Sequence, residues 1–239
     1  MLPTLGALAS LLLSQAAPVL RTPVVLELFS SEGCSSCPDA EALLSDLAAN
    51  QPVAGAKVIA LELHVDYWNR LGWVDPFSDP EYTVRQERYT AALDVMNVYT
   101  PQLVVDGSDQ VVGSDRPGAR RAITAAAARP HPAGVHLTPR AGRLEIEVAH
   151  ANPGDLVVLA LTELQLTTRV PRGENAGRTL QHGPVVRVLK QLGVADSSGA
   201  FSQEYERPSG LGAHARAVVL AQDPRHLQIH GASEVEFPP

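Results

Sequence analysis

The first part of the chain alternates short apolar runs with segments of helical periodicity. Residues 24–29 form an apolar run that ends at a Ser-Ser-Glu-Gly turn, which is typical of a buried strand. Apolar residues then recur three and four positions apart over 40–48, which predicts a helix that stops before Asn50. Residues 57–64 predict a second strand. A strand, a helix and a strand in this order form a βαβ unit, so the two strands are expected to be parallel neighbours in one sheet.

The same alternation continues to about residue 130. A helix is predicted to begin at Asp79 and to end near Asn97, and two short strands, 102–106 and 110–113, form a hairpin after it. The alanine-rich segment 116–128 predicts a third helix. The order β-α-β-α-β-β-α therefore predicts an α/β domain.

The pattern changes at the Arg-Pro-His-Pro segment of residues 129–132. Helical periodicity disappears, and short strand-like runs separated by turn signals such as Asn-Pro-Gly-Asp replace it. The runs are 144–148, 156–161, 185–189, 215–221 and 227–230. Because such strands are typical of a small antiparallel β-sandwich, we predict two domains, 18–130 and 131–239.

The amino terminus has the pattern of a signal peptide. An apolar run over 5–13 is followed by small residues, which suggests cleavage after residue 17. A buried amino-terminal segment is the alternative. The run is shorter than the roughly 20 apolar residues that cross a bilayer, and no later stretch qualifies. We therefore expect an exported protein, periplasmic or extracellular, without a membrane span in the mature chain.

Composition narrows the possible functions. The 239 residues are 45% hydrophobic and 19% charged, which is typical of a folded globular protein, and the formal net charge of −7 argues against a nucleic-acid partner. The chain has two cysteines, Cys34 and Cys37. This number excludes a disulfide-stapled miniprotein, a four-thiolate zinc site and an iron–sulfur cluster.

The two cysteines are spaced as a redox pair. They lie at the junction between the first predicted strand and its helix, where unpaired backbone amides and the helix dipole stabilise a thiolate. We predict that Cys34 is the nucleophile and that Cys37 resolves the mixed disulfide. The pair carries the electrons itself, so no cofactor and no resident metal are predicted. The expected partners are protein or small-molecule thiols and disulfides.

Three other interpretations of the pair stay open. It can be a structural disulfide without turnover. It can bind Cu(I) in a metallochaperone, with His64 as a third ligand. The chain can also be a binding or scaffold module that uses no redox chemistry.

Thr100 and Pro101 directly precede the 102–106 strand. In thioredoxin-like folds a proline at this place is cis, and the backbone of the residue before it pairs with the substrate's extended chain. We therefore predict that these two residues bind substrate.

Other polar and aromatic residues are candidates for tuning the pair. His64 and Asp66 end the second strand at the edge that should face the cysteines, where they tune a thiol or merely anchor the loop. Trp68 begins an aromatic group, completed by Trp73 and Phe77, that is either a lid over the dithiol or a small satellite core.

One more polar segment, with Glu174, Arg178 and His182, has a functional role only if it reaches Cys34. Otherwise it is a surface turn held by an ion pair. His131 and His226 lack partners at ligand spacing and are expected at the surface.

Several stretches resemble one family of exported thioredoxin-like proteins, catalogued as domain of unknown function 1223. They are 27–38 around the cysteines, 64–68, 71–73, 75–77 and 98–102, and the segments 174–180 and 185–187 are similar to the family's carboxyl-terminal part. The resemblance implies a thioredoxin-like fold with a CxxC redox pair and a β-rich carboxyl-terminal domain. It implies no substrate.

Overall fold

The computed structural model describes residues 21–239, so the predicted signal peptide lies outside the described residues. The helices are α1 (Cys37–Asn50), α2 (Pro80–Ala92) and α3 (Arg116–Ala127), with a short 3₁₀ turn, η1 (Asn69–Leu71). The strands of the first half are β1 (Thr22–Ser30), β2 (Ala56–His64), β3 (Gln102–Val105) and β4 (Asp109–Val112). Those of the second half are β5 (Gly134–Arg140), β6 (Arg143–Ala149), β7 (Leu156–Glu163), β8 (Leu166–Arg169), β9 (Thr179–His182), β10 (Val185–Val194), β11 (Phe201–Glu206), β12 (Arg216–Gln222) and β13 (Ile229–Glu236).

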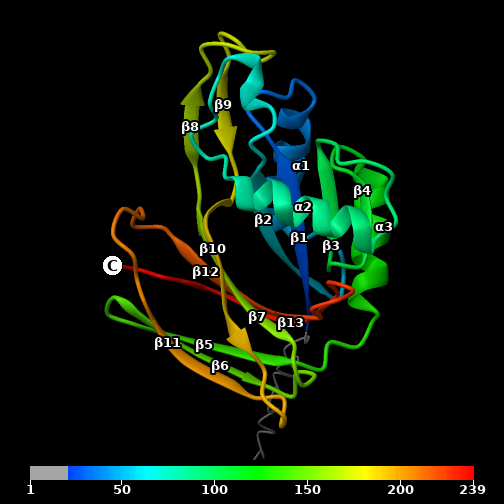
Figure 1. Cartoon of the computed structure of the whole chain (residues 1–239), viewed down its shortest axis with the longest axis vertical. Coiled ribbons are helices and arrows are strands. Elements are labelled where there is room, and N and C mark those ends of the chain that lie inside the picture. Colours follow the sequence, from blue (N-terminus) through cyan, green and yellow to red (C-terminus); the bar gives the residue numbers. More distant parts are fainter. Residues whose placement is uncertain (1–20) are drawn as a thin grey trace, which may run out of the picture.

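A mixed eight-stranded sheet organises the molecule (Figure 1). Its order is β13-β12-β7-β10-β2-β1-β3-β4, and a three-stranded sheet, β11-β6-β5, and the β8–β9 hairpin complete the strands. β1 and β2 are parallel over their whole length, and α1 connects them. The predicted βαβ unit is therefore confirmed.

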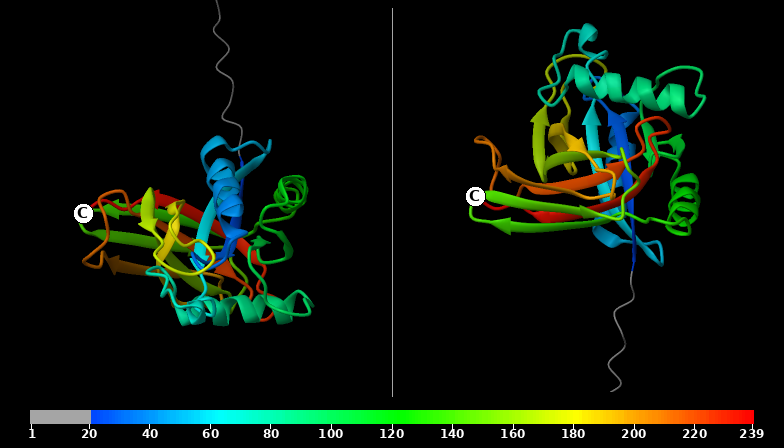
Figure 2. Two further views of the ribbon diagram at one scale, coloured as in Figure 1. Left: turned by 90° about the horizontal axis from the view of Figure 1, so that it is seen from above. Right: turned by 60° about the horizontal axis from the view of Figure 1, so that its bottom comes forward.

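Alternation along β1 distributes the core between two faces of the sheet. Val24, Leu26 and Leu28 point toward α1 and α3, whereas Val25 and Phe29 point toward α2. The helices consequently lie on opposite faces, with α2 alone on its side, as the rotated views show (Figure 2). Period-two alternation of apolar residues on both faces is the pattern of a fully covered strand.

The second helix is shorter than predicted. Asp79 caps it by accepting a hydrogen bond from the backbone N–H of Glu81, but it ends at Ala92 rather than near Asn97. Asp94 adopts a left-handed backbone with φ of 53°, which cannot continue a right-handed helix. The apolar spacing beyond Ala92 therefore belongs to a loop.

The predicted two-domain layout is not confirmed. β10 lies beside β2 in parallel, at Val185 opposite Glu62, and β7, β12 and β13 extend the same sheet beyond it. The core under α2 is shared, because Ile59 of β2 packs in one cluster with Val186 and Leu220 of the second half. The change of pattern at residue 130 marks a change from helical crossovers to antiparallel connections within one large sheet.

A sandwich does form, but it is built on that sheet. Leu144, Ile146 and Val148 of β6 pack against β7 and β12 through Leu159 and Val219. This layer lies at the lower end of the molecule in Figure 1. The strands β5, β8, β9 and β11 were not predicted; β8 and β9 have four residues each, too few for a clear periodicity.

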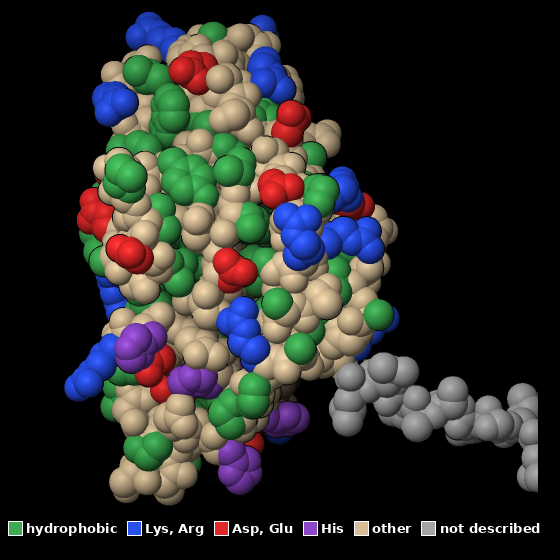
Figure 3. All heavy atoms as spheres, turned by 90° about the vertical axis from the view of Figure 1, so that its right-hand side faces the viewer, with side chains coloured by type: hydrophobic (Ala, Val, Ile, Leu, Met, Phe, Trp, Pro, Cys, Tyr) green, Lys and Arg blue, Asp and Glu red, His purple; other side chains and the backbone are tan. Residues whose placement is uncertain are grey.

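Charged side chains of both signs are interspersed on the face that carries α3 (Figure 3). None of the helices within residues 21–239 is both long and apolar enough to span a lipid bilayer.

Candidate functional site: the cysteine turn and a buried carboxylate–histidine cluster

Cys34 and Cys37 are joined by a disulfide at the start of α1. Their Cα atoms lie 5.5 Å apart, within the usual range for a disulfide. The turn before the helix is held by two backbone bonds: Cys34 N–H donates to Ser31 at 3.1 Å, and Cys37 N–H donates to Cys34 at 3.3 Å. Ser36 occupies the N-cap position without a side-chain cap bond, and Pro38 follows in the first turn. The pair thus stands where the unpaired amides of α1 begin.

The disulfide is buried. Cys34 is 1% exposed and Cys37 is fully buried, whereas Ser35 and Ser36 between them are exposed. Trp68 covers the turn closely, since a Cβ atom at Gly33 would lie only 3.0 Å from its Cβ. A partner can reach the serines directly but not the sulfur atoms.

The segment between β8 and β9 reaches across to the cysteine turn. Asn175 Nδ2 donates to the backbone oxygens of Glu32 and Cys34, both at 2.9 Å, and Asn175 is 1% exposed. Glu174 Oε2 accepts from the backbone N–H of Ser35 at 3.0 Å, and hydrogen bonding by the side chain and backbone of Ser35 lowers the pKa of Glu174. The interpretation of this segment as a mere surface turn is therefore wrong, and the condition for a functional role is met.

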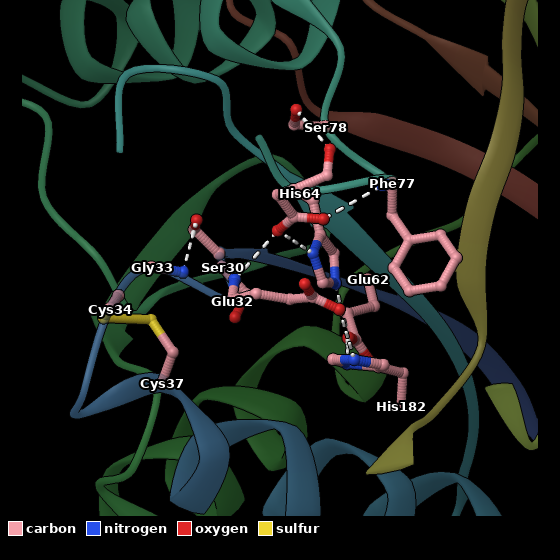
Figure 4. Close-up of polar contacts among 12 residues, drawn as sticks. Ser30, Glu32, Gly33, Cys34, Cys37, Glu62, His64, Phe77, Ser78 and His182 are labelled. Atoms are coloured by element: carbon pink, nitrogen blue, oxygen red, sulfur yellow. Dashed lines mark hydrogen bonds and ion pairs between the residues drawn. A yellow bond between two sulfur atoms is a disulfide. The ribbon is translucent and has the colours of Figure 1, made fainter. Parts of the chain in front are cut away.

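Beside the turn lies a cluster of buried ionisable side chains (Figure 4). Its members come from the cysteine turn, α1, β2, the loop after β2, and β9, and each is at most 4% exposed. They are Glu32, Glu41, Glu62, His64, Asp75 and His182.

His64 is held between two carboxylates. Its Nδ1 lies 2.7 Å from Asp75 Oδ2, and its Nε2 lies 2.7 Å from Glu62 Oε1. Burial alone would lower the pKa of His64, but the two carboxylates raise that pKa to about 10. Burial alone would likewise raise the pKa of Glu62, but hydrogen bonds from His182 and His64 lower it to about 2.

His182 brings the second half of the chain into the cluster. Its Nε2 lies 3.1 Å from Glu32 Oε1, and its Nδ1 lies 3.3 Å from both Glu41 Oε2 and Glu62 Oε1. These carboxylates outweigh the effect of burial and raise the pKa of His182 to about 12. Burial and the neighbouring Glu62 raise the pKa of Glu41.

Comparison with known proteins places the chain in a family. Residues 25–222 match the family described as Protein of unknown function (DUF1223). The chain belongs to this family. The resemblance predicted from the cysteine turn and the segments around it is thereby confirmed for DUF1223.

Solved structures resemble this DUF1223 chain to very different extents. Protein AGR_C_4864 from Agrobacterium tumefaciens is 27% identical, with a TM-score of 0.72 over 90% of this chain and 95% of that one. OgpA from Akkermansia muciniphila is 13% identical, with a TM-score of 0.26 over 46% of this chain and 29% of that one. A domain of the outer membrane lipoprotein Omp28 from Porphyromonas gingivalis is 14% identical, with a TM-score of 0.24 over 45% and 89%. The latter two likenesses support no inference. No curated protein matches the chain.

The structure separates the residues that the sequence grouped at the end of β2. His64 joins the buried cluster, whereas Asp66 accepts a hydrogen bond from Thr83 Oγ1 of α2 at 2.6 Å and anchors the loop. Both ring nitrogens of His64 contact carboxylates of the cluster, not the cysteine sulfur atoms.

Trp68 connects the cysteine turn with the predicted substrate-binding residues. Its indole N–H donates to Thr100 Oγ1 at 2.8 Å, and the Thr100–Pro101 bond is cis, as expected. The other aromatic residues lie over the cluster: Trp73 Nε1 donates to Glu32 Oε2 at 2.6 Å, and the Phe77 ring meets His182 edge-on at 5.2 Å.

Sequence reasoning missed most of the cluster of this DUF1223 protein. Of its members, His64 was predicted as a tuning residue and His182 only as part of a polar segment. Glu62 carried a usable signal, because a single carboxylate within the apolar run of β2 must find a partner once the strand is buried. Glu41 sits on the buried side of α1, where the helical pattern also indicates burial.

Proposed function

We propose that this chain is an exported thiol–disulfide oxidoreductase with a thioredoxin-like arrangement of β1, α1, β2 and the β3–β4 hairpin. One observation carries the proposal: the Cys34–Cys37 disulfide bridges the first turn of α1, directly after the central parallel strand β1. In the reduced form the same amides and dipole favour a thiolate on Cys34.

The exchange reaction needs only the two cysteines. The Cys34 thiolate attacks one sulfur of a substrate disulfide, which forms a mixed disulfide and releases a substrate thiol. The Cys37 thiolate then attacks Cys34, which closes the Cys34–Cys37 bond and releases the second substrate thiol. Two electrons pass to the substrate, and two protons follow them. The reverse sequence oxidises a dithiol partner.

The sulfur atoms are buried, so the segments around the cysteine turn must move before exchange. The β8–β9 segment is the candidate, because Asn175 and Glu174 bind the backbone of this turn. We propose that this segment withdraws before exchange and that Thr100, with Pro101, then pairs with the substrate backbone. Trp68, which contacts Thr100, would position it. The partners are protein or small-molecule thiols and disulfides.

A redox titration tests the proposal. The full mature chain is equilibrated with glutathione buffers, and the thiols are trapped by alkylation. A reversible two-electron midpoint between roughly −120 and −270 mV supports exchange, and its position indicates whether the protein oxidises or reduces its partners. A Cys37→Ser variant should trap partners as mixed disulfides on Cys34, and a Cys34→Ser/Cys37→Ser variant should trap none.

The burial of both sulfur atoms favours one competing function, a structural disulfide. In that case the pair stays oxidised below about −300 mV, and the Cys37→Ser variant traps no partner. Either result would overturn the exchange proposal.

A further inference from the structure

We propose that Glu41, Glu62, His64 and His182 bind one divalent first-row transition-metal ion of the Zn²⁺ type. Each residue offers one ligand atom, and these four atoms all lie within 4.8 Å of one another. All four residues are buried, at most 4% exposed. Two imidazoles with two carboxylates suit zinc and its neighbours in the first transition series. The site is separate from the cysteine pair and does not depend on the exchange proposal.

Two buried polar atoms at this place lack a hydrogen-bond partner. They are Glu41 Oε2 and His182 Nδ1, and they point toward each other across 3.3 Å. Nδ1 lies at the same distance from Glu62 Oε1. In a tetrahedral zinc site with bonds of about 2.0–2.1 Å, neighbouring ligand atoms lie about 3.3–3.4 Å apart. An ion between these atoms would satisfy both orphaned groups with little movement.

Every candidate ligand is oriented by a partner on its far side. Asp75 contacts Nδ1 of His64 at 2.7 Å, and Glu32 contacts Nε2 of His182 at 3.1 Å. In each histidine, the nitrogen left for the ion is the one that faces the cluster. A carboxylate on the outer nitrogen of a ligating histidine fixes the tautomer and makes the ligand more basic.

The two carboxylate ligands have the same kind of support. The second oxygen of Glu62 accepts from the backbone N–H of Gly183 at 2.9 Å, and that of Glu41 accepts from the Ser30 hydroxyl. The backbone approaches closely here: a Cβ atom at Gly183 would lie 2.5 Å from Ser45 Oγ of α1 and 3.2 Å from Glu62 Oε2, so a larger residue would have to displace these side chains.

The charge balance of the cluster also calls for a cation. Four carboxylates face two histidines, so with neutral imidazoles the cluster lacks positive charge. Uncompensated charge in a buried environment is costly, and a divalent ion would supply the two positive charges that otherwise come from protonating both imidazoles, which must be neutral to bind a metal. The ligands come from α1, β2 and β9, so the ion would tie the β8–β9 hairpin to the first half of the chain.

A surface groove borders the site. It has a volume of about 950 Å³, lies between α1 and the β8–β9 hairpin, and has His182 and Gly183 in its wall together with Ala42 and Ser45. The ligand side chains are buried behind this wall, so an ion would enter from this side, away from the disulfide, when the wall opens.

Metal analysis of the intact protein tests the inference. The full mature chain, with its disulfide oxidised, is purified without chelators from zinc-supplemented cells and measured by elemental mass spectrometry. We expect about one equivalent of metal per chain, and after chelation we expect tight Co²⁺ binding with the intense visible bands of a four-coordinate site. X-ray absorption should show nitrogen and oxygen ligands, including imidazole, and no sulfur.

Variants distinguish metal binding at this cluster from metal binding elsewhere in the protein. Glu41→Gln keeps the shape of the side chain and should weaken metal binding at least about 100-fold, whereas Asp75→Asn, which changes only an outer partner, should weaken it about 10- to 100-fold. His131→Gln is the matched control, because His131 also pairs with a buried carboxylate, Asp106, away from the cluster. It and the Cys34→Ser/Cys37→Ser variant should bind normally.

Three results would overturn the inference. The folded wild type holds less than about one tenth of an equivalent and gives no Co²⁺ spectrum. Its absorption spectrum shows sulfur ligands. The cysteine variant loses the ion. The first two are measured on the wild type, so they stand even where a cluster variant fails to fold.

Discussion

Replacing Asn175 by alanine should expose the disulfide to attack. The side-chain amide of Asn175 donates two hydrogen bonds, both at 2.9 Å, to the carbonyl oxygens of Glu32 and Cys34. It is buried, and Arg178 orients it by donating to its Oδ1 at 2.7 Å. Alanine removes both bonds while the β8–β9 segment stays closed, so the Glu32 carbonyl loses this partner and the Cys34 carbonyl keeps only the bond from Cys37 N–H.

The size of the effect follows from these two bonds. A lost hydrogen bond of a buried group costs about 1–1.5 kcal/mol, so the closed arrangement should lose about 2–3 kcal/mol relative to the open one, in which water solvates the carbonyls. A difference of about 1.4 kcal/mol is tenfold in an equilibrium constant. If opening precedes attack in a rapid equilibrium, reduction of the disulfide should accelerate about 30- to 150-fold.

The assay is the rate of disulfide reduction by excess dithiothreitol in native buffer, with acid quenching and alkylation of the thiols. Gln51→Ala is a suitable control, because Gln51 also donates its amide to two carbonyl oxygens, those of Ala48 and Val58, at the opposite end of α1. Its reduction rate should match the wild type. An unchanged rate in Asn175→Ala, with the fold intact, would show that this residue does not control access.

Three further predictions concern other charged groups. Glu174→Gln removes a negative charge beside the amides of the cysteine turn and should raise the reduction potential of the disulfide by roughly 10–20 mV, measured by glutathione titration. Arg85→Leu leaves the buried Glu27 carboxylate unpaired and should cost about 3–5 kcal/mol in urea unfolding, whereas adding Glu27→Leu should recover much of the loss. The hydrogen bond to Asp106 raises the pKa of His131, so protonated His131 should stabilise the fold fully below about pH 6.5. The difference in unfolding free energy between the wild type and His131→Gln should therefore shrink as the pH rises through the raised pKa.

The hydrophobic pattern of a short segment predicted individual helices and strands, but not how distant strands pair. β1, α1 and β2 have strong periodicities and clear boundary residues, and they form within three residues of the predicted limits. The parallel placement of β10 beside β2 has no such signal. It rests on one aligned residue pair, Val185 opposite Glu62, between strands more than a hundred residues apart. A pattern that describes each strand separately cannot indicate which edge the strand will join.

The candidate site likewise has a part that the sequence predicted and a part that it did not. Cys34 and Cys37 are neighbours in the sequence, so their spacing alone predicted the disulfide that the structure contains. The cluster is dispersed from Glu32 to His182, and every member is a single polar residue in an otherwise ordinary segment. His131 shows the same limit: it was expected at the surface, yet its side chain is 6% exposed and Nε2 lies 2.5 Å from Asp106. Side chains that come into contact from distant segments cannot be recognised from their spacing in the sequence.

The β8–β9 hairpin connects the two proposed sites. Asn175, at its tip, closes the cysteine turn, and His182, at the end of β9, enters the carboxylate cluster. Glu32 lies between them, because its backbone oxygen accepts from Asn175 while its carboxylate contacts His182. An ion held by His182 would fix the base of the hairpin and so favour the closed position of its tip. Metal binding and access to the disulfide should therefore oppose each other, since opening the hairpin strains the contacts at its base.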